Sequence, residues 1–262
     1  MMTIHGPVIL DLNTQRDLFT PEGVLPVDGV EKFPDLLKRA FTWAQRQQIP
    51  VVSTRLRDVA APGQRGMGRI VCHPGGAGSG YEKLPSTLLR RRQEMPLDCG
   101  TSLPVEGFKI TQQYIFDLVS LNPFECPRLD RLLSESNAGV WILVGGPLEA
   151  TLRTCVLGLL QRRHKVAVVS DLLGMWDPYE GDMALRQIES KNIEWLTVAQ
   201  MMEKYGPRQI RRPTPAPARV NAAARATARS AATTGRKNHV PQAKNGSSRN
   251  GAKMPKREFK LT

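Results

Sequence analysis

The 262-residue chain has few cysteines, no long apolar run and, over most of its length, no excess of charge. Its four cysteines, Cys72, Cys99, Cys126 and Cys155, are far apart and form no Cys-x-x-Cys pair, which argues against a zinc site or a disulfide framework. Free thiols are typical of a reducing compartment, so we expect a cytoplasmic protein. No apolar run has transmembrane length, and the N-terminus lacks the pattern of a signal peptide.

The formal net charge of +13 is confined to the C-terminal part of the sequence. Residues 207–262 contain 14 Lys and Arg residues against one acid, Glu258, whereas residues 1–206 contain 23 basic and 23 acidic residues. The N-terminal part is therefore electroneutral, and the basicity of the chain says nothing about what this part binds.

Residues 207–262 have almost no large apolar side chains, so they cannot bury enough surface to offset the entropy of ordering. We predict an α/β domain over residues 1–206 and a disordered basic tail over residues 207–262. Two roles of the tail stay open: contact with nucleic acid or an anionic surface through counterion release, or a solubilising extension without a single partner.

The most informative segment is Trp141–Asp171. It consists of an apolar strand (Trp141–Val144), a turn of two glycines and a proline, a helical pattern and a second apolar strand (Val166–Val169). This order predicts a βαβ unit with parallel strands. Ligands of such sheets gather beyond the carboxyl ends of the strands, where free N–H groups at a helix start can hold an anion or oxyanion.

Further apolar runs and helical spacings extend the same pattern. We expect strands at Pro7–Leu12, Ile49–Thr54, Phe108–Ile110 and Ile193–Leu196, and helices at Val30–Gln48, Pro127–Ser136 and Val198–Lys204. Residues 58–107 are glycine-rich and are expected to form long loops. Alternating strands and helices predict a doubly wound, mostly parallel sheet flanked by helices.

Three places are positioned for chemistry. Asp11 ends the first strand, where a carboxylate is either a general base or a loop anchor. Lys109 lies in a short apolar stretch, where it either stabilises an anion or points to solvent. In the turn Gly145-Gly146-Pro147, either glycine is a candidate for positive φ, and the Gly146–Pro147 bond is a candidate for the cis isomer.

Four segments together resemble the isochorismatase-like family of cysteine hydrolases, which includes the nicotinamidases. They are VILDLNTQRDLF, VVSTRLRD, GFKI with the following YIF, and WILVGGPLEATL with KVAVVSD. They span roughly residues 7–200, and their order and spacing are more specific than any one of them. The fold that the resemblance implies, a parallel sheet flanked by helices, agrees with the expectation from the strand pattern.

The resemblance implies a catalytic triad of Asp, Lys and Cys, in which a thiolate at a helix start attacks a carbonyl. Asp11 and Lys109 match the first two members, and the turn Gly145, Gly146 and Pro147, with Ala150, matches the oxyanion-hole region. The cysteine is where the chain departs from the family. A gapless match places Thr151 at the nucleophile position, whereas Cys155 lies four residues later, one helical turn away.

The gapless match is the preferred one because the distance from turn to nucleophile fixes the site geometry. It makes Cys155 a core thiol and leaves Thr151, a β-branched alcohol that needs an adjacent base, as a poor substitute for a thiol. We expect Asp11, Lys109 and Thr151 to converge in one pocket, with Cys155 a turn deeper.

The metal-binding members of the family have Asp-x-His after the second strand and a later histidine. The matching stretch here, Arg55-Leu56-Arg57-Asp58, lacks the first acid and the histidine, although His73 resembles the later histidine. We therefore expect no metal and no other cofactor, and the metal-dependent nicotinamidase activity is disfavoured.

Two functions compete. The first is a hydrolase that cleaves a C–N or related bond of a small molecule, with Asp11 as base, Lys109 as electrostatic helper and Thr151 or Cys155 as nucleophile. The second is a catalytically degenerate member that binds a ligand or acts as a scaffold, with the tail on nucleic acid or an anionic surface. A phosphate-binding role of the glycine turn is weaker, since neither a Gly-x-Gly-x-x-Gly pattern nor a P-loop lysine is present. Family members often associate, so a homo-oligomer is a further expectation.

Overall fold

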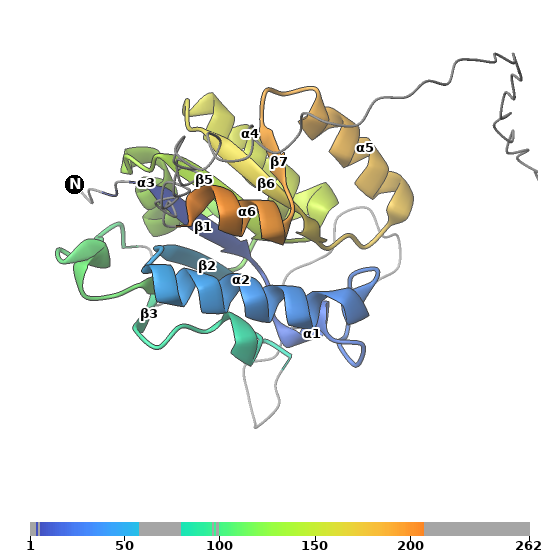
Figure 1. The fold of residues 1–262 in the computed structure, drawn as a ribbon, viewed down its shortest axis with the longest axis horizontal. Coiled ribbons are helices and arrows are strands. Elements are labelled where there is room, and N and C mark those ends of the chain that lie inside the picture. The colour runs from blue at the N-terminus through green and yellow to red at the C-terminus, as the bar shows by residue number, and fades with distance from the viewer. Residues whose placement is uncertain (1–3, 5, 58–79, 96, 98–99, 207–262) are drawn as a thin grey trace, which may run out of the picture. The chain divides into compact units, whose positions relative to one another are not determined.

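The core of the molecule is a parallel sheet of seven strands in the order β3-β4-β2-β1-β5-β6-β7 (Figure 1). The computed structural model describes residues 4, 6–57, 80–95, 97 and 100–206. The strands are β1 (Pro7–Leu12), β2 (Val51–Leu56), β3 (Arg92–Met95), β4 (Gln113–Leu118), β5 (Val140–Gly145), β6 (Val166–Leu173) and β7 (Glu194–Leu196). The predicted fold class, a doubly wound parallel sheet, is confirmed. The predicted tail lies outside the described residues.

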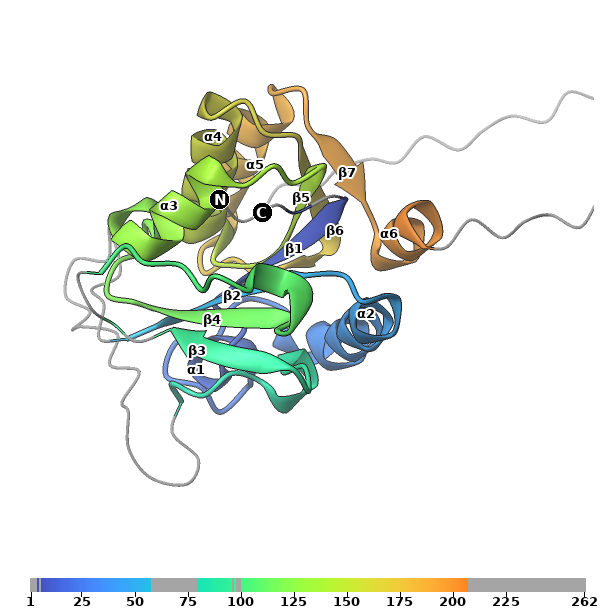
Figure 2. The same ribbon diagram turned by 90° about the vertical axis from the view of Figure 1, so that its left-hand side faces the viewer.

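Helices cover both faces of this sheet, as expected for right-handed crossovers between parallel strands. In Figure 2, α2 (Phe33–Gln47) and α6 (Val198–Tyr205) lie on one face, and α3 (Pro127–Glu135), α4 (Arg153–Gln161) and α5 (Pro178–Glu189) lie on the other. The short helix α1 (Arg16–Phe19) follows β1, and single turns precede or connect the longer elements: η1 (Val30–Lys32), η2 (Pro85–Thr87), η3 (Gly107–Lys109), η4 (Pro123–Glu125) and η5 (Leu148–Leu152).

The central strands β1 and β5 consist mostly of apolar residues because both faces of the sheet are covered. In β1, β2, β4 and β5 almost every residue is buried, and Trp141, Ile142 and Leu143 of β5 have no exposed surface. This is why β1 and β5 are nearly continuous apolar runs rather than alternating ones. Strands β2 and β4 also contain buried polar residues, namely Ser53, Thr54, Arg55, Gln113 and Asp117.

Several boundaries differ from the sequence-based expectation. The segment Phe108–Ile110 is not a strand: η3 occupies Gly107–Lys109, and the strand β4 begins only at Gln113. Strand β4 was missed because Gln113 and Asp117 interrupt its apolar run. Both side chains are buried and bond to side chains of β2, a tertiary contact that the local sequence does not record. Strand β3 was likewise not predicted, since Arg92–Met95 is mostly exposed and polar. Helix α5 was not predicted either.

Strands β1 and β5 are neighbours at the centre of the sheet. The chain first adds strands on one side of β1 and then, starting with β5, adds the remaining strands on the other side. Strands β2, β4 and β3 lie on one side of β1, and β5, β6 and β7 lie on the other. In sheets of this type the crevice at the carboxyl ends of such a strand pair is the usual ligand site. Asp11 and Gly145 stand at that edge, one register position apart.

Candidate functional site

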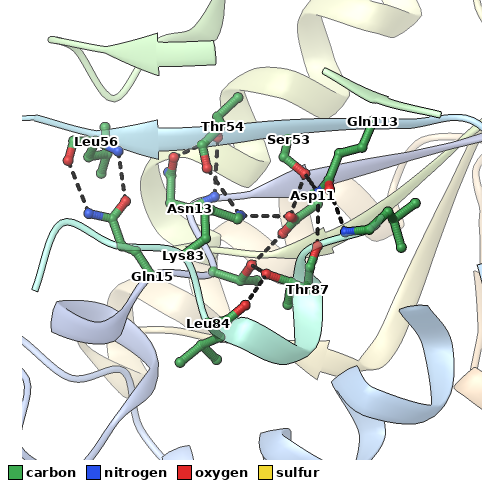
Figure 3. A network of polar contacts seen from close by, with 12 residues as sticks. Asp11, Asn13, Gln15, Ser53, Thr54, Leu56, Lys83, Leu84, Thr87 and Gln113 are labelled. Atoms are coloured by element: carbon green, nitrogen blue, oxygen red, sulfur yellow. Dashed lines mark hydrogen bonds and ion pairs between the residues drawn. The ribbon is translucent and has the colours of Figure 1, made fainter. Parts of the chain in front are cut away.

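Asp11 is completely buried and accepts hydrogen bonds from three side chains. Oδ1 accepts from the Thr14 hydroxyl at 2.7 Å, and Oδ2 accepts from the Ser53 hydroxyl at 2.7 Å and forms an ion pair with Lys83 Nζ at 2.6 Å (Figure 3). A buried carboxylate is stable only when such donors replace its hydration. A carboxylate has about four lone-pair positions, so these three donors leave room for one more contact.

Lys83 reaches this carboxylate from a segment that crosses the end of β1. Gln15 and Lys83 form an antiparallel bridge, and the Gln15 side chain exchanges two hydrogen bonds with the main chain of Leu56. Lys83 Nζ also donates to the carbonyl of Thr54 at 3.2 Å. Burial lowers the pKa of Lys83, whereas the Asp11 carboxylate opposes that shift.

Lys109, the lysine expected beside Asp11, lies elsewhere. It is exposed at the end of η3, four residues before β4 begins, which is the amino end of that strand. Asp11 lies toward the carboxyl ends, and no ion pair joins it to Lys109 in the described part of the chain. The sequence-based choice of lysine therefore failed, because periodicity cannot show that the segment carrying Lys83 crosses the end of β1.

Thr151, the residue at the expected nucleophile position, is fully buried in η5 and contacts the end of β1 through Asn13. Asn13 Nδ2 donates to Thr151 Oγ1 at 3.2 Å and to the carbonyl of Gly146 at 3.1 Å. Asn13 is itself held by Thr54, whose hydroxyl donates to Asn13 Oδ1 at 2.6 Å. Asn13, two positions after Asp11, thus joins the end of β1 to Thr151, and sequence reasoning did not single it out.

Asn13 adopts a left-handed backbone conformation, with φ +54°. Non-glycine residues seldom do so, and asparagine is among those that tolerate it. In this conformation the backbone N–H of Asn13 donates to Thr54 Oγ1 while its side chain turns to Gly146 and Thr151. The only sign of this left-handed conformation in the sequence is the asparagine itself.

The turn between β5 and the following helix brings backbone atoms very close together. Gly145 has φ +97°, and a Cβ atom at this position would lie 2.1 Å from the carbonyl oxygen of Leu12. A Cβ at Gly146 would lie 2.4 Å from the carbonyl oxygen of Gly174. The Gly146–Pro147 bond is cis, and Ala150 is buried next to Thr151. Both glycines are therefore required by geometry, as the sequence suggested for one of them.

Cys155 lies in the hydrophobic core without exposed surface. Burial raises the pKa of its thiol far above the ordinary value, so the thiolate is strongly disfavoured. Cys126 is half-buried at the start of α3, and Cys72 and Cys99 lie outside the described residues. The environment of Cys155 is that of a core thiol.

Two arginines occupy the stretch that the sequence resemblance matches to the metal ligands of metal-binding family members. Arg55 and Arg57 contact the carboxylate of Asp117, and Asp58 and His73 lie outside the described residues. Within the described ranges no group of three or more His, Cys, Asp or Glu side chains is arranged to hold a metal. No helix in the described part of the chain is both long and apolar enough to cross a bilayer.

No family model and no curated protein matches this sequence. Solved structures do match. An isochorismatase-like hydrolase from Alkaliphilus metalliredigens superposes with a TM-score of 0.55 at 17% identity, over 78% of this chain and 98% of the other. Pyrazinamidase of Pyrococcus horikoshii in complex with zinc gives 0.53 at 18% identity, over 73% and 98%. The MAR1 ribonuclease from Caenorhabditis elegans gives 0.51 at 15% identity, over 76% and 81%.

These similarities show that the chain has the fold of the isochorismatase-like and cysteine hydrolases. The resemblance stated from the four sequence segments is thereby confirmed at the level of the fold. The aligned region covers nearly the full length of several of these proteins.

Proposed function

We propose that this protein is a hydrolase that acts on a C–N or related bond of a small molecule through Asp11, Lys83 and Thr151. The observation that carries the proposal is the buried ion pair of Asp11 and Lys83 at the carboxyl end of the central strand. A buried ion pair is weak support for stability compared with apolar packing, so its presence at the ligand edge favours a functional role.

The proposed roles follow from the contacts. The carboxylate of Asp11 keeps one acceptor position for a proton, and the ammonium of Lys83 stabilises the negative charge of that carboxylate. Thr151 Oγ1 accepts from Asn13 and keeps its own proton to donate. Attack by this hydroxyl on an amide carbonyl forms a C–O bond and transfers the hydroxyl proton to Asp11. The C–N bond then breaks, the amine leaves with the proton held by Asp11, and water hydrolyses the resulting ester and restores Thr151. The backbone N–H groups of Glu149 and Ala150 are the candidates for holding the oxyanion, since the Leu148 N–H donates to the carbonyl of Gly174.

A second candidate function, ligand binding without turnover, is favoured by one specific observation. Thr151 is an alcohol of ordinary acidity whose oxygen already accepts a hydrogen bond, which makes it a weaker nucleophile than a thiolate. In that case Asp11 and Lys83 bind a small polar ligand that is not cleaved.

Replacement of the nucleophile distinguishes the two functions. Ammonia release from a panel of small amides is measured for the wild-type protein and for T151C, T151A and D11N, with T154C as the matched control, because Thr154 stands one turn further along α4 and is half-buried. For a hydrolase we expect wild-type turnover, its loss in D11N and T151A, and an increase in T151C but not in T154C.

Turnover by T151C alone indicates a binding protein with intact site geometry. If no variant hydrolyses any amide and the introduced thiol at position 151 reacts no faster than that at position 154, the site assignment is wrong.

A further inference from the structure

We infer that Arg57 and the cluster around it form an oxyanion subsite, so that the substrate or ligand of this protein carries a carboxylate or phosphate group. The inference deepens the proposed function by naming the class of substrate, and it rests on Asp11 and Lys83 being the polar centre of the same site. The cluster consists of Arg55, Arg57, Tyr81, Glu94 and Asp117.

The cluster lies on the same face of the sheet as Asp11. Side chains alternate between faces along a strand, so Ser53, Arg55 and Arg57 of the β2 segment point the same way. Ser53 donates to Asp11, and Arg55 pairs with Asp117, its register partner on β4. A continuous row of polar groups therefore runs from Asp11 toward the carboxyl edge.

The covering segment is the same one that supplies Lys83. Tyr81 precedes Lys83 by two residues, which limits the separation of their Cα atoms to about 7 Å. The guanidinium carbons of Arg55 and Arg57 lie 4.4 Å and 5.1 Å from the centre of the Tyr81 ring. One segment thus carries both the partner of the catalytic carboxylate and the aromatic ring on which the two arginines stack.

The one buried carboxylate of the cluster is shared between its two arginines. Asp117, whose side chain is 4% exposed, is shared: Oδ1 accepts from Arg55 Nε at 2.6 Å and Oδ2 contacts Arg57 Nη2 at 2.9 Å. The second carboxylate, Glu94, pairs only with Arg55 and is 60% exposed, so water screens it. Arg57 therefore has no carboxylate of its own, and Asp117 balances its guanidinium charge only in part.

Arg57 is the member that has donors to spare. Its side chain is 36% exposed, whereas that of Arg55 is 11% exposed and is held by two carboxylates. Arg57 Nε donates to the Tyr81 hydroxyl at 3.1 Å and Nη2 contacts Asp117, and Nη1 takes part in no contact within the described residues. A guanidinium fixed in this way loses little entropy on binding, and its fork matches carboxylate and phosphate geometry.

Calorimetric titration tests the inference with ligands that carry an amide at one end and an anion at the other. The series succinamate, glutaramate and adipamate is compared with neutral pentanamide, and inorganic phosphate is titrated separately. Arg57→Gln is the test variant and Arg46→Gln, on the exposed face of α2, is the matched control. Arg57→Lys keeps the charge and removes the fork.

We expect at least one monoamide anion to bind the wild-type protein about tenfold more tightly than pentanamide, and R57Q but not R46Q to lose this difference. R57K should retain part of it. Stronger competition by phosphate than by the monoamides identifies a phosphate group as the natural partner, and the reverse result identifies a carboxylate.

Equal binding of pentanamide and the anions, equal losses in R57Q and R46Q, or no binding of any anion overturns the inference. The readout is heat of binding, so it is independent of turnover. Binding of the anions without hydrolysis by any variant contradicts only the proposed function, whereas hydrolysis of pentanamide without a preference for anions contradicts only the subsite.

Discussion

Lys83 Nζ lies 2.6 Å from Asp11 Oδ2, with both side chains closed off from solvent. The two residues are 72 positions apart in sequence, and a single antiparallel bridge between Gln15 and Lys83 brings them together. This ion pair, rather than one between Asp11 and Lys109, is the centre of the polar network at the end of β1.

Breaking this ion pair should destabilise the fold strongly. Lys83→Met leaves the Asp11 carboxylate buried without its counterion, and we expect a loss of about 3–5 kcal/mol in the free energy of unfolding, measured by urea denaturation. The double variant D11N/K83M should recover part of it, because no charge remains buried. Arg131→Gln, which breaks an exposed pair with Glu135, should change stability by less than about 1 kcal/mol. A similar small effect of K83M would show that the pair is not buried as described.

Native thiol labelling should separate the two described cysteines. Burial in the core raises the pKa of the Cys155 thiol, so we expect Cys155 to react only when the protein is unfolded. Cys126 is half-buried and should react in the native state. Reaction with a small electrophile is followed at each site by mass spectrometry, with and without urea. Fast native labelling of Cys155 would reopen its assignment as the nucleophile.

Gly145→Ala should cost more stability than the same change at a less crowded glycine. Alanine at position 145 combines a φ of +97° with a Cβ contact of 2.1 Å to the Leu12 carbonyl, so we expect a loss above about 2 kcal/mol. Gly29→Ala is the matched control, because Gly29 has φ +68° and its nearest neighbour would lie 3.6 Å away. There only the backbone strain of about 1–2 kcal/mol remains. Equal urea midpoints of the two variants would contradict the close approach of β5 to β1.

His164 should make the fold less stable in mild acid. Burial against Trp141, together with Arg162, lowers the pKa of this imidazole from its ordinary value of 6.5. The unfolded chain therefore binds a proton at pH values where the folded protein does not, so stability is full above pH 6.5 and falls as the pH decreases below it. Urea midpoints at pH 8 and pH 5 should differ more for the wild-type protein than for His164→Gln. The same pH dependence in both proteins would assign the effect to other groups.

Sequence alone determined the fold class of this protein and its two central strands, but not β3, β4 or α5. The apolar runs of β1 and β5 and the amphipathic pattern of α2 are local signals, because a strand covered on both faces must be apolar and a helix covered on one face must be periodic. The turn at Gly145 was equally readable, since only glycine tolerates the required φ beside another main chain. The position of Asp11 at the end of the first apolar run was also readable, whereas its burial was not.

The partners of that aspartate were decided only by the tertiary structure. Lys83 and Ser53 reach Asp11 across strands and loops, and Asn13 joins Thr151 by turning its backbone left-handed. Lys109 has the more suggestive sequence context but lies at the opposite end of a strand whose start the sequence did not reveal. Hydrophobic periodicity shows which side of a helix or strand is buried. A hydrogen bond between residues far apart in sequence depends on the register between strands and on where one segment crosses another, and no local pattern shows either.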